Sequence, residues 1–161
     1  MKAFETSPTL EAAMAKLGQS RSQSAQTDAS ALPSADVNAA LDPNYEGAFD
    51  KRNSSVIGQG VALTKYTGSR GKVESNDANP EYVARIRRLF DDNGVVWQVG
   101  ELGKVDQGGG GTVAYLLSRY GMEVVDCGPA LLGMHSPFEV AAKADIYAAY
   151  KAYKVFMQEF E

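Results

Sequence analysis

The stretch Ala130-Leu131-Leu132-Gly133-Met134-His135-Ser136-Pro137-Phe138-Glu139 is the most informative part of the sequence. Its apolar first half predicts a β-strand that ends on His135, the only histidine of the chain. Ser136 and Pro137 are typical of a helix start, and Glu139 has capping-box spacing, so we predict a long amphipathic helix to the C-terminus. Open α/β sheets bind ligands at the carboxyl ends of their strands. His135 is therefore a candidate ligand, although an isolated histidine more often serves a structural purpose.

Strands and helices alternate along the chain from Leu32 onward. Candidate strands cover 36–41, 61–66, 95–99 and 122–127, and candidate helices cover 79–90 and 112–120. The helix over 79–90 opens with a capping asparagine and a proline and then carries apolar residues at helical spacing. The segment 67–77 is predicted as a polar loop. These patterns predict an α/β fold, in which a layered sheet is flanked by helices.

Length and composition limit the function classes. A chain of 161 residues supports one packed core. The net charge of −4 argues against general nucleic-acid binding, which needs a basic face. No apolar run is long enough to span a membrane, and no signal-peptide core is found near Met1. The lone Cys127 cannot form an internal disulfide, which favours a reducing compartment. We expect a cytoplasmic protein without membrane or nucleic-acid partners.

The chain divides by composition into two regions. Residues 1–31 comprise a short helix, capped by Ser7 and closed by Gly18, and a flexible linker rich in Ser, Gln and Ala. The linker carries almost no large apolar side chain, so it cannot offset the entropy of ordering. Residues 32–161 are expected to hold the packed domain.

Asp36 places a carboxylate among small residues where a strand is predicted. Burying an unpaired charge is costly, so this side chain needs a cation or several hydrogen-bond donors. The alternative is a turn residue that bonds its own backbone. An aspartate and a histidine from two strand ends are also two members of a zinc site, but a catalytic zinc typically takes three protein ligands.

Two further features carry less specific signals. The run Gly108-Gly109-Gly110-Gly111-Thr112 precedes a helix, so its amides could hold an anion or let a substrate approach closely. It lacks the pattern of a phosphate loop or a dinucleotide fingerprint, and the alternative is a flexible turn. Lys65, at the end of an apolar strand, either offers a cation to an acidic substrate group or extends to water, and spacing favours the latter.

Several of these segments together resemble a known family, the aspartyl aminopeptidase family of metallopeptidases, in its C-terminal part. The similarity covers roughly residues 32 to 160. The segments that carry it, in order, are Ser34-Ala35-Asp36, Asp42-Pro43-Asn44-Tyr45, Lys65-Tyr66, Ser75-Asn76-Asp77-Ala78, Gly109-Gly110-Gly111-Thr112 and Ala130 to Ser136.

The resemblance implies a metal-dependent aminopeptidase that removes N-terminal residues, including acidic ones, from peptides. In such enzymes two divalent metals, usually zinc, share a bridging water that attacks the peptide carbonyl. By motif, Asp36 resembles a ligand of one metal and His135 the histidine ligand of the other. Lys65 resembles the residue that contacts the substrate side chain. Gly110, Gly111 and Thr112 resemble part of the substrate-binding wall.

The sequence also departs from the family pattern. The family needs a second histidine, a bridging aspartate, a glutamate ligand and a glutamate general base, which lie in an N-terminal half, so we assign no catalytic residue here. We expect a C-terminal fragment that is inactive alone and works with a partner N-terminal half, or self-associates through its exposed edge. The alternatives are a non-catalytic remnant or binding module, and an unrelated small-molecule binder that uses the glycine run.

Overall fold

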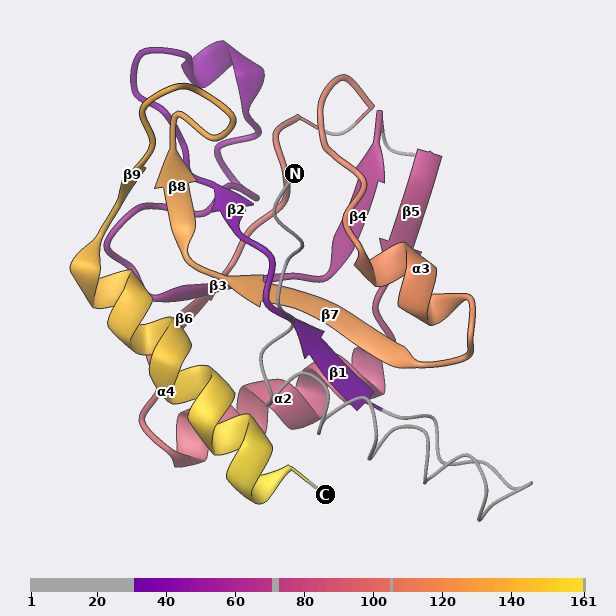
Figure 1. The fold of residues 1–161 in the computed structure, drawn as a ribbon. Helices are drawn as coiled ribbons and strands as arrows, with labels where there is room; N and C mark the ends of the chain where they lie inside the picture. Colours follow the sequence, from indigo (N-terminus) through magenta and orange to yellow (C-terminus); the bar gives the residue numbers. More distant parts are fainter. Residues whose placement is uncertain (1–30, 71–72, 105, 161) are drawn as a thin grey trace, which may run out of the picture. The chain divides into compact units, whose positions relative to one another are not determined.

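The structure of the chain is a computed structural model that describes residues 31–70, 73–104 and 106–160 (Figure 1). Ala31–Glu161 form one compact unit. The helix and linker predicted for residues 1–31 lie outside the described residues, apart from Ala31, which begins the first strand. The division of the chain at residue 31 stays a prediction.

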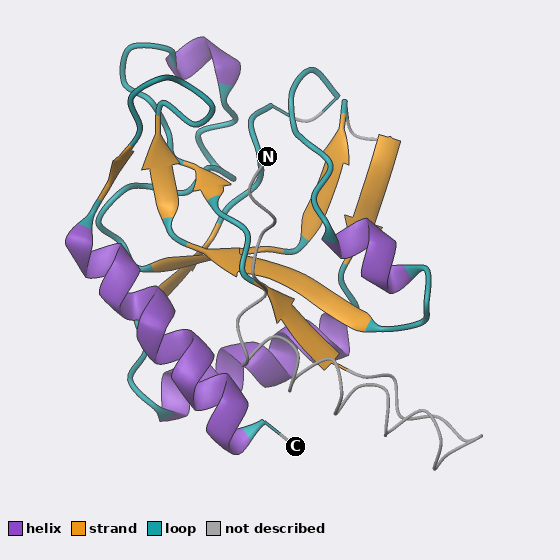
Figure 2. Cartoon of the chain, viewed as in Figure 1, coloured by secondary structure: helices purple, strands orange, loops and turns teal. Residues whose placement is uncertain are grey.

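A four-stranded mixed sheet lies at the centre of this unit (Figures 1 and 2). The strands of this sheet in spatial order are β1 (Ala31–Ser34), β7 (Glu123–Gly128), β3 (Val61–Thr64) and β6 (Trp97–Val99). β7 runs parallel to β1 on one side and antiparallel to β3 on the other, and β3 pairs in parallel with β6. The edge strands of this sheet are β1 and β6.

Two smaller sheets and the helices surround this sheet. One small sheet contains β2 (Asn38–Ala39), β8 (Ala130–Leu132) and β9 (Val140–Ala141), and the other is the hairpin of β4 (Tyr66–Ser69) and β5 (Val73–Asp77). β2 follows β1 in the chain and β8 follows β7, and β2 pairs in parallel with β8 just as β1 does with β7. The helices are η1 (Glu46–Ala48), α2 (Pro80–Asp92), α3 (Ala114–Ser118) and α4 (Lys143–Glu159). None of the helices in the described ranges is long and apolar enough to cross a membrane.

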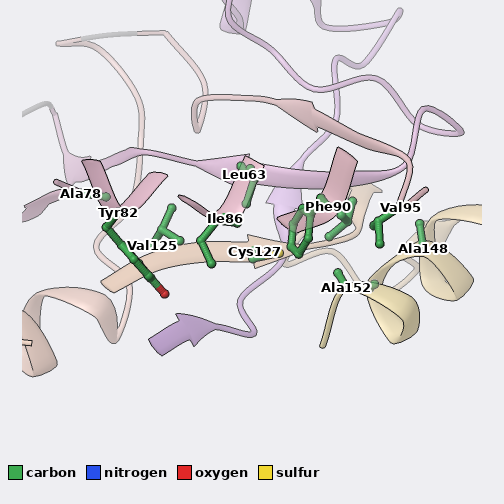
Figure 3. Packing of buried hydrophobic residues seen from close by; sticks show 12 residues of the cluster. Leu63, Ala78, Tyr82, Ile86, Phe90, Val95, Val125, Cys127, Ala148 and Ala152 are labelled. Carbon is green, nitrogen blue, oxygen red and sulfur yellow. The ribbon is translucent and has the colours of Figure 1, made fainter. Parts of the chain in front are cut away.

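The hydrophobic core lies between α2, α4 and one face of the central sheet (Figure 3). Ile86 and Phe90 of α2 are fully buried against Val125 and Cys127 of β7. Each large apolar side chain that is fully buried contributes about 1.5–3 kcal/mol to folding. The core side chains alternate along β7 with Val124 and Asp126, which therefore belong to the opposite face.

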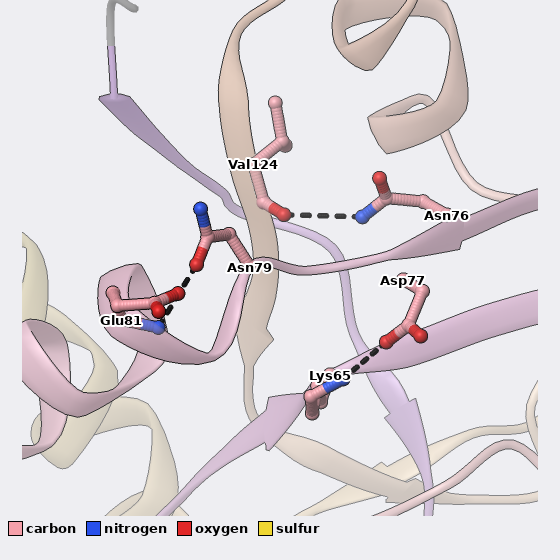
Figure 4. A network of polar contacts seen from close by, with 6 residues as sticks. All are labelled: Lys65, Asn76, Asp77, Asn79, Glu81 and Val124. Carbon is pink, nitrogen blue, oxygen red and sulfur yellow. Dashed lines mark hydrogen bonds and ion pairs between the residues drawn. The ribbon is translucent and has the colours of Figure 1, made fainter.

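The predicted start of α2 is confirmed. Asn79 is its N-cap, and its side-chain oxygen accepts a hydrogen bond from the Glu81 N–H at 2.9 Å (Figure 4). Pro80 occupies the first turn, where a missing N–H costs nothing. The apolar spacing that predicted the helix also sets its buried face, since Ile86 and Phe90 lie on it.

The predicted start of the C-terminal helix is wrong. Residues 133–139 form a hairpin loop between β8 and β9, and α4 begins only at Lys143, without a side-chain cap. Glu139 accepts a hydrogen bond from the His135 N–H at 2.6 Å, and Ser136 Oγ accepts one from Phe138 N–H at 3.2 Å. The capping-box residues therefore stabilise a loop, because pairing of Val140 with Leu132 keeps the chain extended beyond it.

Two other predicted segments differ from the structure. The strand predicted for 36–41 is shorter and covers only β2, because the chain leaves β1 at Ser34 and pairs again, with β8, from Asn38. The segment 67–77, predicted as a polar loop, largely forms the β4–β5 hairpin. Its polar residues lack the apolar alternation of a half-buried strand, and β5 is largely exposed, so the pattern gave no strand signal.

Asp145 fastens α4 to the loop that precedes β3. It lies in the first turn of α4 and its side chain is fully buried. Its two carboxylate oxygens accept hydrogen bonds from the backbone N–H groups of Gly58 and Gly60, each at 2.7 Å. A buried carboxylate is tolerated here because both of its oxygens are hydrogen-bonded.

We predict that Asp145→Ala lowers the free energy of unfolding by about 3 kcal/mol, since it removes two charge-assisted hydrogen bonds and leaves the N–H donor of the buried Gly60 unpaired. Urea denaturation followed by circular dichroism measures the change. Asp92→Ala is the control, because this exposed side chain is expected to change stability by less than about 0.5 kcal/mol. Equal effects of the two substitutions would contradict the role given to Asp145.

Candidate functional site

A buried polar row crosses the face of the central sheet opposite the core. Asp126 on β7 pairs with Ser34 on β1 and with Thr64 on β3, and all three side chains are buried. Asp126 Oδ1 and Ser34 Oγ are buried without a hydrogen-bond partner among the described residues. Side chains directly opposite one another on paired strands point to the same face. The row therefore holds two buried polar atoms that have no partner among the described residues.

Burial raises the pKa of the Asp126 carboxyl, and the nearby Asp36 carboxylate acts in the same direction. The Thr112 and Ser34 hydroxyl groups oppose this rise. Thr112 Oγ1 donates a hydrogen bond to Asp126 Oδ2 at 2.6 Å. Asp126 was not singled out from the sequence, although an aspartate inside the apolar run 124–127 is the kind of buried charge that marked Asp36.

Asn38 joins β2 to the end of the central sheet through a fully bonded polar network. Its amide donates to Thr64 Oγ1 at 2.5 Å and to the Gly100 carbonyl at 3.2 Å. Its amide oxygen accepts from Ser55 Oγ at 2.7 Å. This network is buried, so its satisfied bonds hold the strand ends around the polar row.

Asp36 lies in the connection between β1 and β2 and is half-buried. Its Oδ1 accepts a hydrogen bond from the Val37 N–H at 2.9 Å. The Asp36 backbone packs against Gly128, where an added Cβ would lie only 2.1 Å from the Asp36 carbonyl oxygen. The Asp36 backbone thus lies beside the junction of β7 and β8, and one oxygen of its carboxylate is bonded to the N–H of the next residue.

His135 lies in the exposed hairpin loop after β8, with a φ of 65°. Asp36 precedes the parallel β2–β8 pair, which begins at Asn38 and Ala130, whereas His135 follows the end of β8 at Leu132. Among the described residues, no group of three or more His, Cys, Asp or Glu side chains is placed to hold a metal. The assignment of Asp36 and His135 as metal ligands stays a prediction.

Lys65 lies just beyond β3 and forms an ion pair with Asp77 of β5 (Figure 4). Glu101 lies nearby, just beyond β6. Burial raises the pKa of the Glu101 carboxyl to about 7, Lys65 opposes this rise and Asp77 adds to it. Nothing in the sequence pattern indicates that the loop carrying Glu101 lies against β3 and β4.

The glycine run packs along the edge of β4. The carbonyl groups of Gly110 and Gly108 accept hydrogen bonds from the N–H groups of Gly68 at 3.0 Å and Arg70 at 2.9 Å. Thr112 is buried and its hydroxyl also accepts a hydrogen bond from the Ala114 N–H at 3.3 Å. The run is therefore a closely packed strand-like segment rather than a free turn, and the Thr112 side chain is engaged inside the protein.

A pocket lies between this glycine segment, β4 and the loop after β6. Its walls include Tyr66, Thr67 and Gly68 of β4, Glu101 and Lys104 of the loop, and Gly109. Of the predicted substrate-binding residues, Gly110 and Gly111 follow this wall directly, and Lys65 precedes it. The structure thus places these segments around one pocket, while the role predicted for each residue stays untested.

We predict that Gly109→Ala destabilises the protein by more than about 1 kcal/mol, while Gly110→Ala changes stability by less than that. An added Cβ at Gly109 would lie 2.5 Å from the Gly68 carbonyl oxygen, at a φ of 84°. At Gly110 the nearest atom, on the Leu102 side chain, is 4.0 Å away. Thermal unfolding compares the two, and equal losses would contradict the packing of the run against β4.

We predict that Glu101 makes stability depend on pH between 4.5, the ordinary value for its carboxyl, and about 7. A raised folded-state pKa means that the folded protein binds the proton more tightly, so this contribution to stability is present at low pH and is lost as pH rises through about 7. Glu101→Gln should remove that loss. Urea denaturation across this range measures the difference between the two proteins, and parallel pH profiles would contradict the assignment.

Comparison with known proteins identifies relatives of the whole packed unit. A family model described as aminopeptidase I zinc metalloprotease (M18) matches residues 5–157. The Probable M18 family aminopeptidase 1 of Clostridium acetobutylicum is 57% identical over 128 residues, which are 80% of this chain and 28% of that protein. The protein of the same name from Thermotoga maritima is 54% identical over 126 residues, 78% of this chain and 28% of that protein. The chain thus spans less than a third of these relatives.

Solved structures agree with the predicted fold. The crystal structure of aminopeptidase I from Clostridium acetobutylicum has a TM-score of 0.73 and 57% identity, covering 78% of this chain and 27% of that one. The M18 aminopeptidase from Thermotoga maritima has a TM-score of 0.77 and 52% identity, covering 81% of this chain and 29% of that one. These matches confirm the predicted α/β fold of sheets flanked by helices.

The predicted family is confirmed as well. Aspartyl aminopeptidase 4 of Saccharomyces cerevisiae is 26% identical over 131 residues, which are 79% of this chain and 25% of that protein. The two bacterial relatives share more than half of their aligned residues with this chain. The family model covers most of the sequence. By all of these measures the chain belongs to the M18 family of aminopeptidase I zinc metalloproteases.

Proposed function

We propose that this chain forms the C-terminal part of the catalytic unit of a metal-dependent aminopeptidase, which hydrolyses N-terminal residues from peptides. The observation that carries the proposal is 57% identity over 128 residues to an M18 aminopeptidase. The substrate is a peptide with a free N-terminal residue. The pocket bounded by β4 and the glycine segment supports a binding role for this region.

The side chains of the described residues do not complete a zinc site. Asp36 and His135 are two candidate ligands, whereas a catalytic zinc typically takes three protein ligands and an open position. Within the described ranges no third His, Cys, Asp or Glu joins either of them. The family description supports zinc as the metal. We propose that the remaining ligands and the general base come from further residues of the peptidase, on this or another chain.

The chain's own residues then have positioning roles. Asp126 holds Thr112, and through it the start of α3 and the end of the glycine segment. Asn38 and Ser55 hold the first residues after Asp36 to the end of the central sheet. These contacts orient the segments that carry the candidate ligand and the candidate substrate wall. The chain alone is proposed to be inactive, and a non-catalytic binding module is the second candidate because the described residues form no three-ligand group.

A chimera tests this proposal. Residues 31–158 of this chain replace the matching C-terminal segment of the Clostridium acetobutylicum aminopeptidase, and hydrolysis of aminoacyl chromogenic substrates is measured with zinc, manganese or cobalt. We expect metal-dependent turnover from the chimera and none from the chain alone. Asp36→Asn and His135→Ala should each lower turnover by at least about a hundredfold, as expected for loss of a metal ligand or its partner.

Asp92→Asn in the same chimera is the matched control, since Asp92 is an exposed aspartate at the end of α2. It should leave turnover unchanged. A folded chimera without turnover, or one whose turnover survives both Asp36→Asn and His135→Ala, would overturn the proposal. In that case the binding-module candidate would remain.

A further inference from the structure

The chain places Lys65 and Glu101 side by side. β3 and β6 run in parallel with Leu63 opposite Val99, and Lys65 and Glu101 each follow that pair by two residues. The Gly100 N–H donates to the Leu63 carbonyl at 3.2 Å, which continues the pairing beyond the strands. Both charged side chains therefore leave the carboxyl ends of neighbouring parallel strands, the part of an α/β sheet where ligands bind.

The charge of Lys65 is already matched within the protein. Its ammonium group forms an ion pair with Asp77, which lies opposite Tyr66 on the β4–β5 hairpin (Figure 4). Glu101 adds a second carboxylate beside this pair. Two carboxylates thus face one ammonium group, so an acidic substrate side chain at Lys65 would meet net negative charge.

The Glu101 carboxylate differs from that of Asp77 in its contacts. In the part of the chain that the structure describes, no hydrogen bond or ion pair reaches its carboxylate, although the side chain is partly buried. Glu101 lines the pocket, together with Tyr66, Leu102 and Gly109. Lys104 also borders the pocket but is exposed. A partly buried, unpaired carboxylate in a pocket is a binding group for a cation.

We propose that the Glu101 pocket binds the cationic nitrogen group of a peptide, an ammonium or guanidinium, and that it disfavours an acidic first residue. The peptide as the source of this group rests on the proposed aminopeptidase function. Glu101 supplies the carboxylate, Tyr66 and Leu102 supply apolar walls, and the glycine segment leaves space because it carries no side chains. Lys65 acts as a partner of Asp77 rather than as a receptor for acidic side chains.

The ionisation of Glu101 supports this assignment. Because burial raises the pKa of its carboxyl to about 7, a bound cation would stabilise the charged form and offset its desolvation. The charged groups around it are Lys65, Asp77 and Lys104. Binding of a permanent cation should therefore weaken as pH falls through about 7, when Glu101 takes up a proton.

Ligand titrations of the full chain without added metal, followed by amide resonances in NMR spectra, test the proposal. N-acetyl-L-argininamide offers only a side-chain guanidinium, L-leucinamide only an α-ammonium, and the 1-amide of N-acetyl-L-aspartic acid only a carboxylate. We expect one or both cationic probes to shift the resonances of Gly68 and Gly109, and the acidic probe to shift neither. The responding cationic probe identifies the source of the nitrogen group.

Glu101→Gln should weaken binding of the responding probe by about tenfold or more, as expected for one charge-assisted contact. Glu81→Gln, which alters an exposed glutamate of α2, should leave binding unchanged. Equal affinity of the wild type and Glu101→Gln, tighter binding of the acidic probe, or zinc as the only ligand of Glu101 would each overturn the proposal. Because no hydrolysis is measured, failure of the chimera would remove the aminopeptidase function and leave this result standing.

Discussion

Strand β7 is the constraint on which the rest of the structure depends. It pairs in parallel with β1 on one side and antiparallel with β3 on the other. The chain continues from β7 into β8, which pairs with β2. The side chains of β7 alternate between the two faces of the sheet: Val125 and Cys127 face the helices, and Asp126 belongs to the polar row on the opposite face. Burying a polar side chain in the middle of a strand costs free energy, and the hydrogen bond from Thr112 to Asp126 offsets part of this cost.

Asp126 lies between the ends of two neighbouring strands, and each of these strands ends on a buried polar residue. Ser34 ends β1 and Thr64 ends β3, and both lie in register with Asp126. From this row the chain departs in different directions, toward Asp36 after β1 and toward Lys65 after β3. Asp36, a candidate metal ligand, and Lys65, a candidate substrate residue, thus follow two strands that flank one buried carboxylate, although they are far apart in the sequence.

Where an element depends on its own residues, the sequence was enough to predict it. The start of α2 is one case, because Asn79 caps it locally and its apolar spacing sets the buried face. The start of α4 is a contrary case, because the same local signals at Ser136 and Glu139 were overridden by pairing of β9 with β8. The β4–β5 hairpin gave no signal for a similar reason, since an exposed polar strand depends on its partners and not on a hydrophobic pattern.

The same distinction applies to the candidate site. Asp36, His135 and Lys65 could be singled out by residue type and by resemblance, but Asp126 and Glu101 became visible only from their neighbours. Glu101 is informative because its environment, and not its identity, makes it unusual. Its loop packs against β3, and among the described residues no ion pair reaches its carboxylate, which lies near the Lys65–Asp77 ion pair. The charge balance around Lys65 depends on the register of β3 and β6. This balance can reverse the substrate specificity that the lysine alone would suggest from the sequence.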